Sequence, residues 1–510
     1  MAKNRTFVNV ASSVVLFLSG IITSFWLTPV IIENIGVEAN GFIGLGNNII
    51  SYITLVTTAL NSMASRFITI FYIKKDYKKA NEYYNSIFWG NLIIMAVFLL
   101  PLIYFVVNLE NLISVPANIL SEVRLMFIIV FLNFVVNTCM PKWSCATFIT
   151  NRLDRSYFPN VIISVLRTAV IVILYTALPP RLWYVSLVSM VTYLIGVAVA
   201  RYNAGVLTPE LKLHLKPKKI IWSFSAIKEL VSSGIWNSIS SVGNMLLSGL
   251  DLIICNLFIG ATEMGVLSLS KTLPHLMQSL SSSICNAFAP ELVINYAQGD
   301  KEKVLKDINR AMKLTSVILI VPLAGIIVMG SEFYKLWVPS QDAKLLSFLT
   351  IITCAGYAFT SGTQILYNVF ATVNKVKANA VLMIVSGAVS TAAVFVLLNT
   401  TNLGIFAIAG VSTVVNFIRN MIYTLPFTAK YLGFKKTQFF PQVLTCVTST
   451  LLLSTIGFML KRFFTISSWL DFFAVAAIIG ILFSIVNIFV FLSKEERKVL
   501  FDKIKRKIKR

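Results

Sequence analysis

Six basic side chains of this 510-residue chain fall inside long apolar stretches, where a charge requires an explanation. They are Arg66, Arg124, Lys142, Arg167, Lys271 and Arg419. A charged side chain at the centre of a bilayer costs about 2.5–3.5 kcal/mol on insertion scales, so each needs a wet cavity, a partner or a route to the interface. Arginine can form two parallel hydrogen bonds to a phosphate, and lysine offers a point charge. A cleft lined by such groups could therefore hold an anionic head group within a membrane.

Uncharged polar side chains accompany these cations on two predicted helix faces. The first face carries Asn47, Ser51, Thr54, Thr58 and Ser62 at spacings of three or four residues, the period of one side of a helix. A second face, 224 residues later, carries Lys271, His275, Gln278, Ser282 and Asn286. Two apolar helices with one wet face each indicate a polar cavity inside a membrane protein, and their amide and hydroxyl groups could bind the hydroxyls of sugars.

The cations are not equal candidates for substrate binding. Arg167 lies in the middle of its apolar stretch, on a face with Asn160 and Ser164, and is too deep to reach the interface easily. Lys271 belongs to the second polar face, whereas Lys142 is expected mainly to anchor its helix at the inner interface. The predicted substrate-binding residues are Asn47, Arg66, Arg124, Arg167, Lys271, His275, Gln278 and Arg419.

Three of these arginines lie nearer to helix ends, so a second interpretation stays open for them. Arg66 follows the first polar face but lies near the cytoplasmic end of its helix, from which it could extend to the head groups. Arg124 is close to the outer mouth of its helix, and Arg419 lies in the inner third of its own.

Acidic residues are scarce within the apolar stretches. Only Asp251 lies clearly inside one, on a face with Asn237, Ser241, Asn244 and Ser248. Two interpretations stay open: a carboxylate paired with Arg or Lys at the outer interface, or a proton or Na⁺ site that couples transport to an ion gradient. Beyond such an H⁺ or Na⁺, no cofactor is predicted.

Motifs of catalysis and of metal binding are not found in the sequence. The six cysteines fall in apolar stretches without a CxxC pair, which indicates small core residues and no metal site. Gly-rich phosphate loops, HExxH and GxSxG are absent, and no predicted loop exceeds about 30 residues. We therefore expect no enzymatic activity.

The composition of the chain indicates that membrane-spanning helices position these side chains. The chain is 57% hydrophobic and 13% charged, with a mean hydropathy of +0.80, which excludes a soluble globular protein. Stretches of about 20 apolar residues recur along its length, as membrane crossing requires. We predict an all-α polytopic protein with fourteen spans, at residues 7–31, 42–70, 83–107, 119–146, 158–178, 183–200, 229–258, 265–290, 312–330, 346–370, 378–399, 404–427, 438–460 and 469–492.

Basic residues are distributed unequally between alternate predicted loops. One side holds 33 Lys and Arg residues and the other 5. By the positive-inside rule this places both termini in the cytoplasm and favours an even number of spans. The net charge of +23 is then explained by topology and by attraction to anionic membrane lipids, without nucleic acid as a partner.

An internal repeat organises the chain. Residues 36–80 recur without gaps 224 positions later, so that Gly36 and Gly41 return as Gly260 and Gly265. Because each copy has an even number of spans, the two halves are parallel repeats about an axis along the membrane normal. The predicted parts are an N-terminal half (1–200), a basic cytoplasmic linker (201–228), a C-terminal half (229–430), a hairpin of two helices (431–493) and a basic amphipathic tail (494–510) that lies on the membrane surface.

These features resemble a known transporter superfamily. The turn Ile35-Gly36 to Gly41-Phe42, its second copy and the twelve-plus-two spans look like the multidrug/oligosaccharidyl-lipid/polysaccharide (MOP) exporters, and within them the bacterial Wzx-type oligosaccharide flippases. Asp251 also fits, although the basic residue that often follows is Leu252 here. The resemblance implies a V-shaped alternating-access fold. It also implies transport of an undecaprenyl-pyrophosphate-linked glycan from the inner to the outer leaflet of a bacterial cytoplasmic membrane.

Other functions compete with this one. A flippase for a lipid-linked peptidoglycan precursor has similar requirements, and a cation-coupled multidrug exporter is disfavoured because the first 200 residues contain no carboxylate in the middle of a span. A membrane glycosyltransferase or polymerase predicts a large outer loop that we do not find. A lipid-linked oligosaccharide and membrane lipids are the expected partners, together with a polysaccharide polymerase and chain-length machinery.

Overall fold

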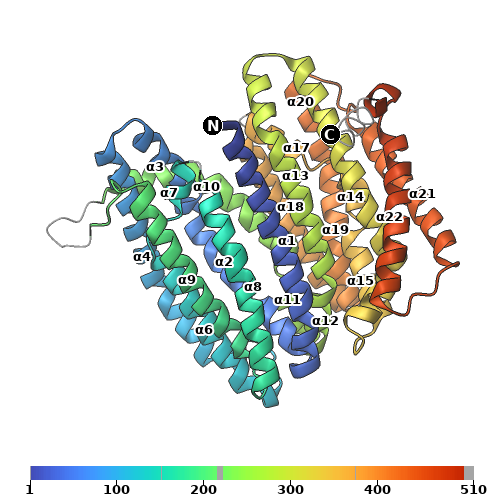
Figure 1. Ribbon diagram of the computed structural model, residues 1–510, viewed down its shortest axis with the longest axis horizontal. Helices are drawn as coiled ribbons and strands as arrows, with labels where there is room; N and C mark the ends of the chain where they lie inside the picture. The colour runs from blue at the N-terminus through green and yellow to red at the C-terminus, as the bar shows by residue number, and fades with distance from the viewer. Residues whose placement is uncertain (1, 151, 215–221, 374, 499–510) are drawn as a thin grey trace. The chain divides into compact units, whose positions relative to one another are not determined.

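The computed structural model describes residues 2–150, 152–214, 222–373 and 375–498, and in these residues the regular structure is helical without strands (Figure 1). The predicted all-α class is confirmed. The helices up to the linker are α1 (Ala2–Ile35), α2 (Val37–Asn61), α3 (Ala64–Ile73), α4 (Tyr77–Val107), α5 (Leu109–Leu112), α6 (Leu120–Cys139), α7 (Cys145–Ile149), α8 (Asp154–Ala177) and α9 (Trp183–Leu207).

The helices after the linker include two π-helical turns, η3 and η4. They are α10 (Phe224–Asn244), η3 (Met245–Gly249), α11 (Asp251–Phe258), α12 (Ala261–Ser270), α13 (Thr272–Ala297), α14 (Lys301–Trp337), α15 (Ala343–Cys354), α16 (Tyr357–Thr360), α17 (Leu366–Thr372), α18 (Val376–Thr400), α19 (Ile405–Arg419), η4 (Asn420–Thr424), α20 (Leu425–Leu432), α21 (Phe440–Lys461) and α22 (Trp469–Phe491).

The number of membrane spans differs from the prediction of fourteen. Within the described residues, 12 helical segments are long and apolar enough to cross a membrane, and α10 with α11, bent by 41°, would make 13. The predicted span 265–290 corresponds to α12 and α13, which do not qualify. The helix α12 has only 10 residues, and α13 carries polar side chains such as His275 and Gln278, so fourteen spans are not confirmed.

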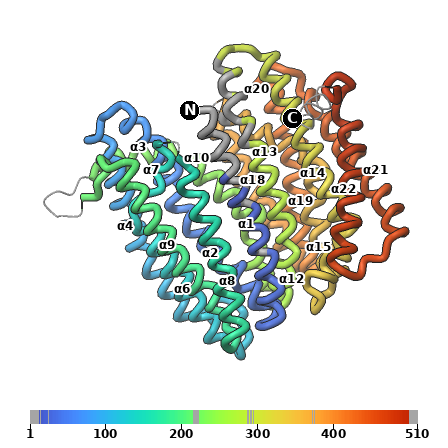
Figure 2. Tube along the Cα trace, in the orientation of Figure 1, coloured from blue at the N-terminus to red at the C-terminus, as the bar shows by residue number. Residues whose placement is uncertain are grey.

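The helices form two compact units, which are described separately. The first contains Met1–Met245 and Leu252–Gly265, and the second contains Leu246–Asp251 and Val266–Arg510. In the first unit, α8 packs against α1 and α9, and α2 packs against α10 (Figure 1). In the second unit, α14 packs against α13, α15, α21 and α22. Figure 2 shows α14 beside α22.

In both copies of the repeat, an aspartate caps the N-terminus of the equivalent helix, which is α4 in the first copy and α14 in the second. Asp76 caps α4 by accepting a hydrogen bond from the Lys79 amide at 3.1 Å, and Asp300 caps α14 with the Lys303 amide at 2.9 Å. A carboxylate at this position satisfies an amide that has no partner within the helix. Because both pairs are 224 residues apart, the repeat seen in the sequence is also a repeat of local structure.

Within the first unit, residues of one copy contact their own equivalents in the other. A Cβ atom added to Gly41 would lie 2.9 Å from the Gly265 Cα, and the Thr262 hydroxyl donates to the Glu38 carboxylate at 2.8 Å. Both pairs are separated by 224 residues. Equivalent positions of the two copies therefore lie together in the first unit. Only glycine permits this approach of the two backbones.

The linker after α9 is held on α4 by side-chain amides that mimic a backbone ladder. The Asn81 amide donates to the Glu210 carbonyl at 2.8 Å and accepts from the Lys212 amide at 2.7 Å, and Asn85 contacts the next residues likewise. The Tyr72 hydroxyl donates to the Glu210 carboxylate and lowers its pKa, since the hydrogen bond stabilises the charged form. Most of the basic run of the linker, residues 215–221, lies outside the described residues.

The last two helices and the residues after them contact α14 at several points along its length. Lys461 donates to Glu332 at 2.6 Å, and Lys313 donates to Glu496 at 2.9 Å. Between them, the buried Asn487 amide donates to the Val317 carbonyl at 3.0 Å. The predicted hairpin therefore packs as part of the second unit. Most of the predicted amphipathic tail, with Leu500, Ile504 and Ile508, lies outside the described residues.

Candidate functional site

The first unit contains a polar cavity of about 630 Å³. Its wall is formed by α6, α7, α8, α9 and the segment between α6 and α7, and Asn47 of α2 also contributes. Amide and hydroxyl groups make up much of this wall, including those of Asn133, Asn137, Asn160, Ser164, Thr192 and Asn203. No Asp or Glu is among the described residues that line it. The cavity therefore offers neutral hydrogen-bonding groups and cations.

Arg167 is the cation that α8 supplies to this cavity. It lines the wall together with Asn160 and Ser164, the residues that helical periodicity placed on its face. Its Nε is buried and has no hydrogen-bond partner among the described residues. A guanidinium without a carboxylate partner in a polar cavity retains its full charge for an anionic ligand.

Lys142, which was expected mainly to anchor its helix at the inner interface, also lines the cavity. The predicted span 119–146 is wrong at its end, because α6 stops at Cys139 and Met140 is extended before Pro141. Proline disfavours the helical conformation of the residue before it, so Pro141 was the signal for this break. Burial lowers the pKa of the Lys142 ammonium because the charged form loses hydration.

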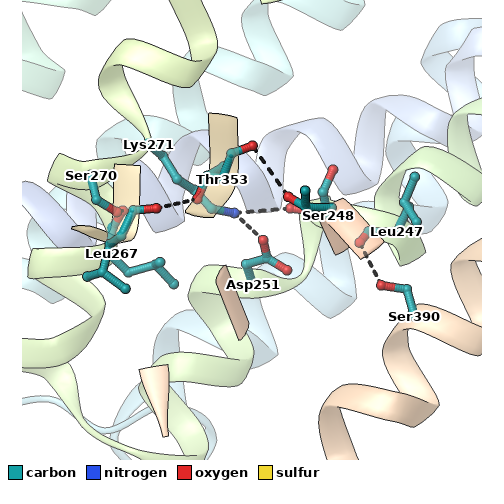
Figure 3. Close-up of polar contacts among 10 residues, drawn as sticks. Leu247, Ser248, Asp251, Leu267, Ser270, Lys271, Thr353 and Ser390 are labelled. Atoms are coloured by element: carbon teal, nitrogen blue, oxygen red, sulfur yellow. Dashed lines mark hydrogen bonds and ion pairs between the residues drawn. The ribbon is translucent and has the colours of Figure 1, made fainter. Parts of the chain in front are cut away.

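The second unit joins two of the predicted site residues in one ion pair. Figure 3 shows the Lys271 ammonium between the Asp251 carboxylate and the Ser248 carbonyl. The Lys271 Nζ lies 3.3 Å from the carbonyl oxygen, and the two charged side chains retain 13% and 7% of their exposure. Two interpretations were open for Asp251, and the contact with Lys271 corresponds to the one in which the carboxylate is paired with a basic side chain. Lys271 itself was predicted for substrate binding.

The backbone beside this pair is opened by the π-helical turn η3. The Leu246 carbonyl accepts from the Thr391 hydroxyl at 2.7 Å, and the Leu247 carbonyl accepts from the Ser390 hydroxyl at 3.1 Å. Both hydroxyls come from α18, and with Lys271 they satisfy three successive carbonyls (Figure 3 shows Ser390). A π-turn and a bend leave such carbonyls without their usual helical partners. No sequence signal marked Ser390 or Thr391.

Arg419 is buried among neutral groups at the start of the other π-helical turn, η4. Its Nη2 donates to the Tyr367 hydroxyl and to the Asn416 Oδ1, both at 2.7 Å, and its guanidinium lies 5.4 Å from the Tyr367 ring centre. A further nitrogen contacts the Met383 sulfur. With only 7% of its surface exposed, Arg419 is a buried cation for which the described residues show no carboxylate partner.

The remaining predicted residues lie on more open faces. Arg66 on α3 is exposed, and Arg124 is paired with Glu110 at 3.4 Å near a helix end. His275 and Gln278 are exposed on α13, and the Gln278 carbonyl accepts from a tyrosine hydroxyl at 2.8 Å. The side chain of Asn286 lies outside the described residues.

The first polar face, on α2, directs acceptor atoms outward. The Ser51, Thr54 and Thr58 hydroxyls each donate to the carbonyl four residues earlier, at 2.8–2.9 Å. Because the proton of each hydroxyl is used within the helix, its lone pairs remain to accept hydrogen bonds. Asn47, Ser51 and Thr54 are exposed, and of these three Asn47 is the one that lines the polar cavity.

Comparisons with known proteins found a matching family model and a relative that covers nearly the whole chain. A family model described as "Polysaccharide biosynthesis protein" matches residues 48–342. The "Uncharacterized membrane protein EpsK" of Bacillus subtilis (strain 168) is 25% identical over 500 residues, with 98% of each chain covered.

Two solved structures show the same fold. The lipid II flippase MurJ, in an inward closed conformation, has a TM-score of 0.64 at 14% identity and covers 94% of this chain and 98% of its own. An inward-facing multidrug resistance MATE family transporter of the MOP superfamily has a TM-score of 0.61 at 13% identity, with coverages of 82% and 94%. At these identities the likeness concerns the fold alone.

Proposed function

Because this chain belongs to the family of polysaccharide biosynthesis proteins, we propose that it is a flippase for an undecaprenyl-pyrophosphate-linked oligosaccharide. Family and fold indicate a multi-pass membrane transporter of the MOP superfamily. The substrate would move from the inner to the outer leaflet. The protein would lie in a bacterial cytoplasmic membrane with both termini in the cytoplasm. A polysaccharide polymerase and chain-length machinery would then act on the exported glycan.

The observation that carries the proposal is the chemistry of the cavity in the first unit. Arg167 and Lys142 supply positive charge, and the surrounding amides and hydroxyls supply neutral donors and acceptors. A lipid-linked pyrophosphate must cross about 30 Å of hydrocarbon, and the cavity could replace the hydration that the phosphates and sugars lose. A drug exporter for cations would need acidic groups where this wall has basic ones.

The second unit contains an apolar cavity of its own, whose chemistry suits a polyprenyl chain. Its volume is about 260 Å³, and its wall combines Leu273 of α13 with side chains of α14 and α22. Gly325 and Gly480 leave room there, since a Cβ on either would meet no atom within 4 Å. The described residues that line this cavity all have apolar side chains or none, which suits a polyprenyl chain.

A flippase for a lipid-linked peptidoglycan precursor is the second candidate. Its substrate carries the same pyrophosphate and polyprenyl groups, so the two cavities suit both, and the lipid II flippase MurJ shares the fold. The two candidate substrates differ in the group that the pyrophosphate carries.

The direct test is transport by the purified protein. In proteoliposomes, the chain should move an undecaprenyl-pyrophosphate oligosaccharide between leaflets, as followed by the access of an external glycan-modifying enzyme. Lipid II serves as the competing substrate and a cationic dye as the drug-exporter control. Movement of lipid II alone would establish the second candidate, and movement of the dye alone would refute both flippase functions.

Filling the apolar cavity tests the proposed place of the polyprenyl tail. We expect Gly480→Phe to slow transport by about tenfold, because displacing two buried methylene groups at about 0.8 kcal/mol each gives roughly that factor. The control is Ile481→Phe, which changes the exposed neighbour on the same helix. Equal rates for wild type and Gly480→Phe would show that the tail does not use this cavity.

A further inference from the structure

One short helical segment belongs to a different unit from the helices on either side of it. Residues Leu246–Asp251 group with the second unit, whereas α10 before them and Leu252–Phe258 after them group with the first. The same segment contains the π-helical turn η3 and the 41° bend. The segment is therefore an irregular stretch of backbone that is bounded on both sides by parts of the first unit.

Three kinds of contact attach the segment to the second unit. Thr391 and Ser390 donate to its carbonyls at 2.7 and 3.1 Å, and Lys271 contacts both the Ser248 carbonyl and the Asp251 carboxylate. The hydroxyl contacts are neutral hydrogen bonds. Among these contacts, the ion pair is the one that an external anion could exchange, because an ammonium also binds phosphate oxygens.

Lys271 is placed where an anionic substrate could reach it. It precedes α13 by one residue, and the face of α13 that continues from it carries the exposed side chains of His275 and Gln278. The lysine side chain retains 13% of its exposure, so its ammonium is not sealed. An ammonium has three donor protons, and its two contacts here leave one for a further acceptor.

We propose that the Asp251–Lys271 pair is a lock on the segment 246–251, and that the anionic head group of the substrate opens it by competing with Asp251 for Lys271. The proposal rests on the proposed function, because it takes the pyrophosphate as the competing anion. In the closed lock, Asp251 neutralises Lys271 and holds the segment on the second unit. When phosphate oxygens take the ammonium, Asp251 loses its partner and the segment is released. Substrate binding and release of the bend are thereby one event.

The competition predicts an effect of Asp251 that depends on Lys271. With the purified full chain in nanodiscs, Asp251→Asn should tighten binding of undecaprenyl pyrophosphate about tenfold, within the usual range of coupling between two equilibria. Lys271→Gln should weaken binding, and adding Asp251→Asn to it should change nothing further, because the competitor matters only while the contested cation is present. Undecaprenol, which has the same tail without phosphates, should bind all variants alike.

Glu332→Gln is the matched control. Glu332 also forms a carboxylate–lysine pair in the second unit, with Lys461 at 2.6 Å, and lies outside the proposed site. It should leave the affinity for undecaprenyl pyrophosphate at the wild-type value. An equal tightening by Glu332→Gln would reduce the effect to general charge and overturn the competition.

Hydrogen exchange tests the lock without relying on affinity. The amides of residues 246–251 should exchange faster in wild type when undecaprenyl pyrophosphate is added, and should exchange fast in Asp251→Asn without any ligand. Slow exchange in ligand-free Asp251→Asn would overturn the lock itself. Unchanged affinity in that variant, with normal binding by wild type, would overturn the competition alone. Absence of binding by the wild-type chain would overturn the competition together with the proposed function.

Discussion

Replacing Arg167 with alanine should abolish export of the surface glycan. The guanidinium lines the polar cavity of the first unit, where no described wall residue is acidic, and its Nε has no protein partner. Each charge-assisted hydrogen bond lost is worth about 1.5–3 kcal/mol, so losing two would slow transport by at least about a hundredfold. The measurement is surface glycan in cells that depend on this chain, with the amount of protein in the membrane determined in parallel.

Further substitutions at the same position distinguish charge from geometry. Arg167→Lys should retain part of the activity, because a point charge replaces a bidentate donor, and Arg167→Glu should be worse than alanine because it repels phosphates. Arg181→Ala is the control, since Arg181 in the same unit is half exposed and paired with Glu122 at 2.7 Å. Normal glycan export by Arg167→Ala would remove the cationic cavity from the mechanism, and export of cationic dyes by Arg167→Glu would favour a drug exporter.

Replacing Gly265 with alanine should prevent normal assembly of the first unit. The added Cβ would lie 2.4 Å from the Val37 carbonyl oxygen, which is backbone and cannot rotate away. Overpacking of this kind costs about 1–3 kcal/mol, and here it falls where the two copies of the repeat meet. We expect a clearly lower melting temperature in detergent and a smaller monodisperse fraction in size-exclusion chromatography.

Gly205→Ala provides the matched control for this steric argument. Gly205 is also helical and in the first unit, but a Cβ there meets nothing within 4 Å. Alanine is favoured over glycine inside a helix by about 0.5–1 kcal/mol, so this variant should be as stable as wild type or slightly more stable. A Gly265→Ala protein that melts with wild type would show that the crossing of α2 and α12 can open without cost.

The sequence alone determined that the protein is a helical membrane protein, and it placed Arg167 on a polar helix face. A mean hydropathy of +0.80 with recurrent apolar stretches allows only membrane helices, because the backbone must satisfy its own hydrogen bonds in lipid. The repeat predicted equivalent structures, and the two aspartate caps and the contact of Gly41 with Gly265 bear this out. Helical periodicity also placed Arg167 with Asn160 and Ser164, which line one cavity.

Only the tertiary structure decided which charges are paired and where helices break. Lys271 and Asp251 lie on different helices, so their contact depends on the bend at η3 and on the hydroxyls of α18 that stabilise it. Periodicity assigns a residue to a face of its own helix, but the partner of that face depends on the packing of helices distant in sequence. For the same reason Lys142, expected at the interface, lines the cavity once α6 ends at Cys139.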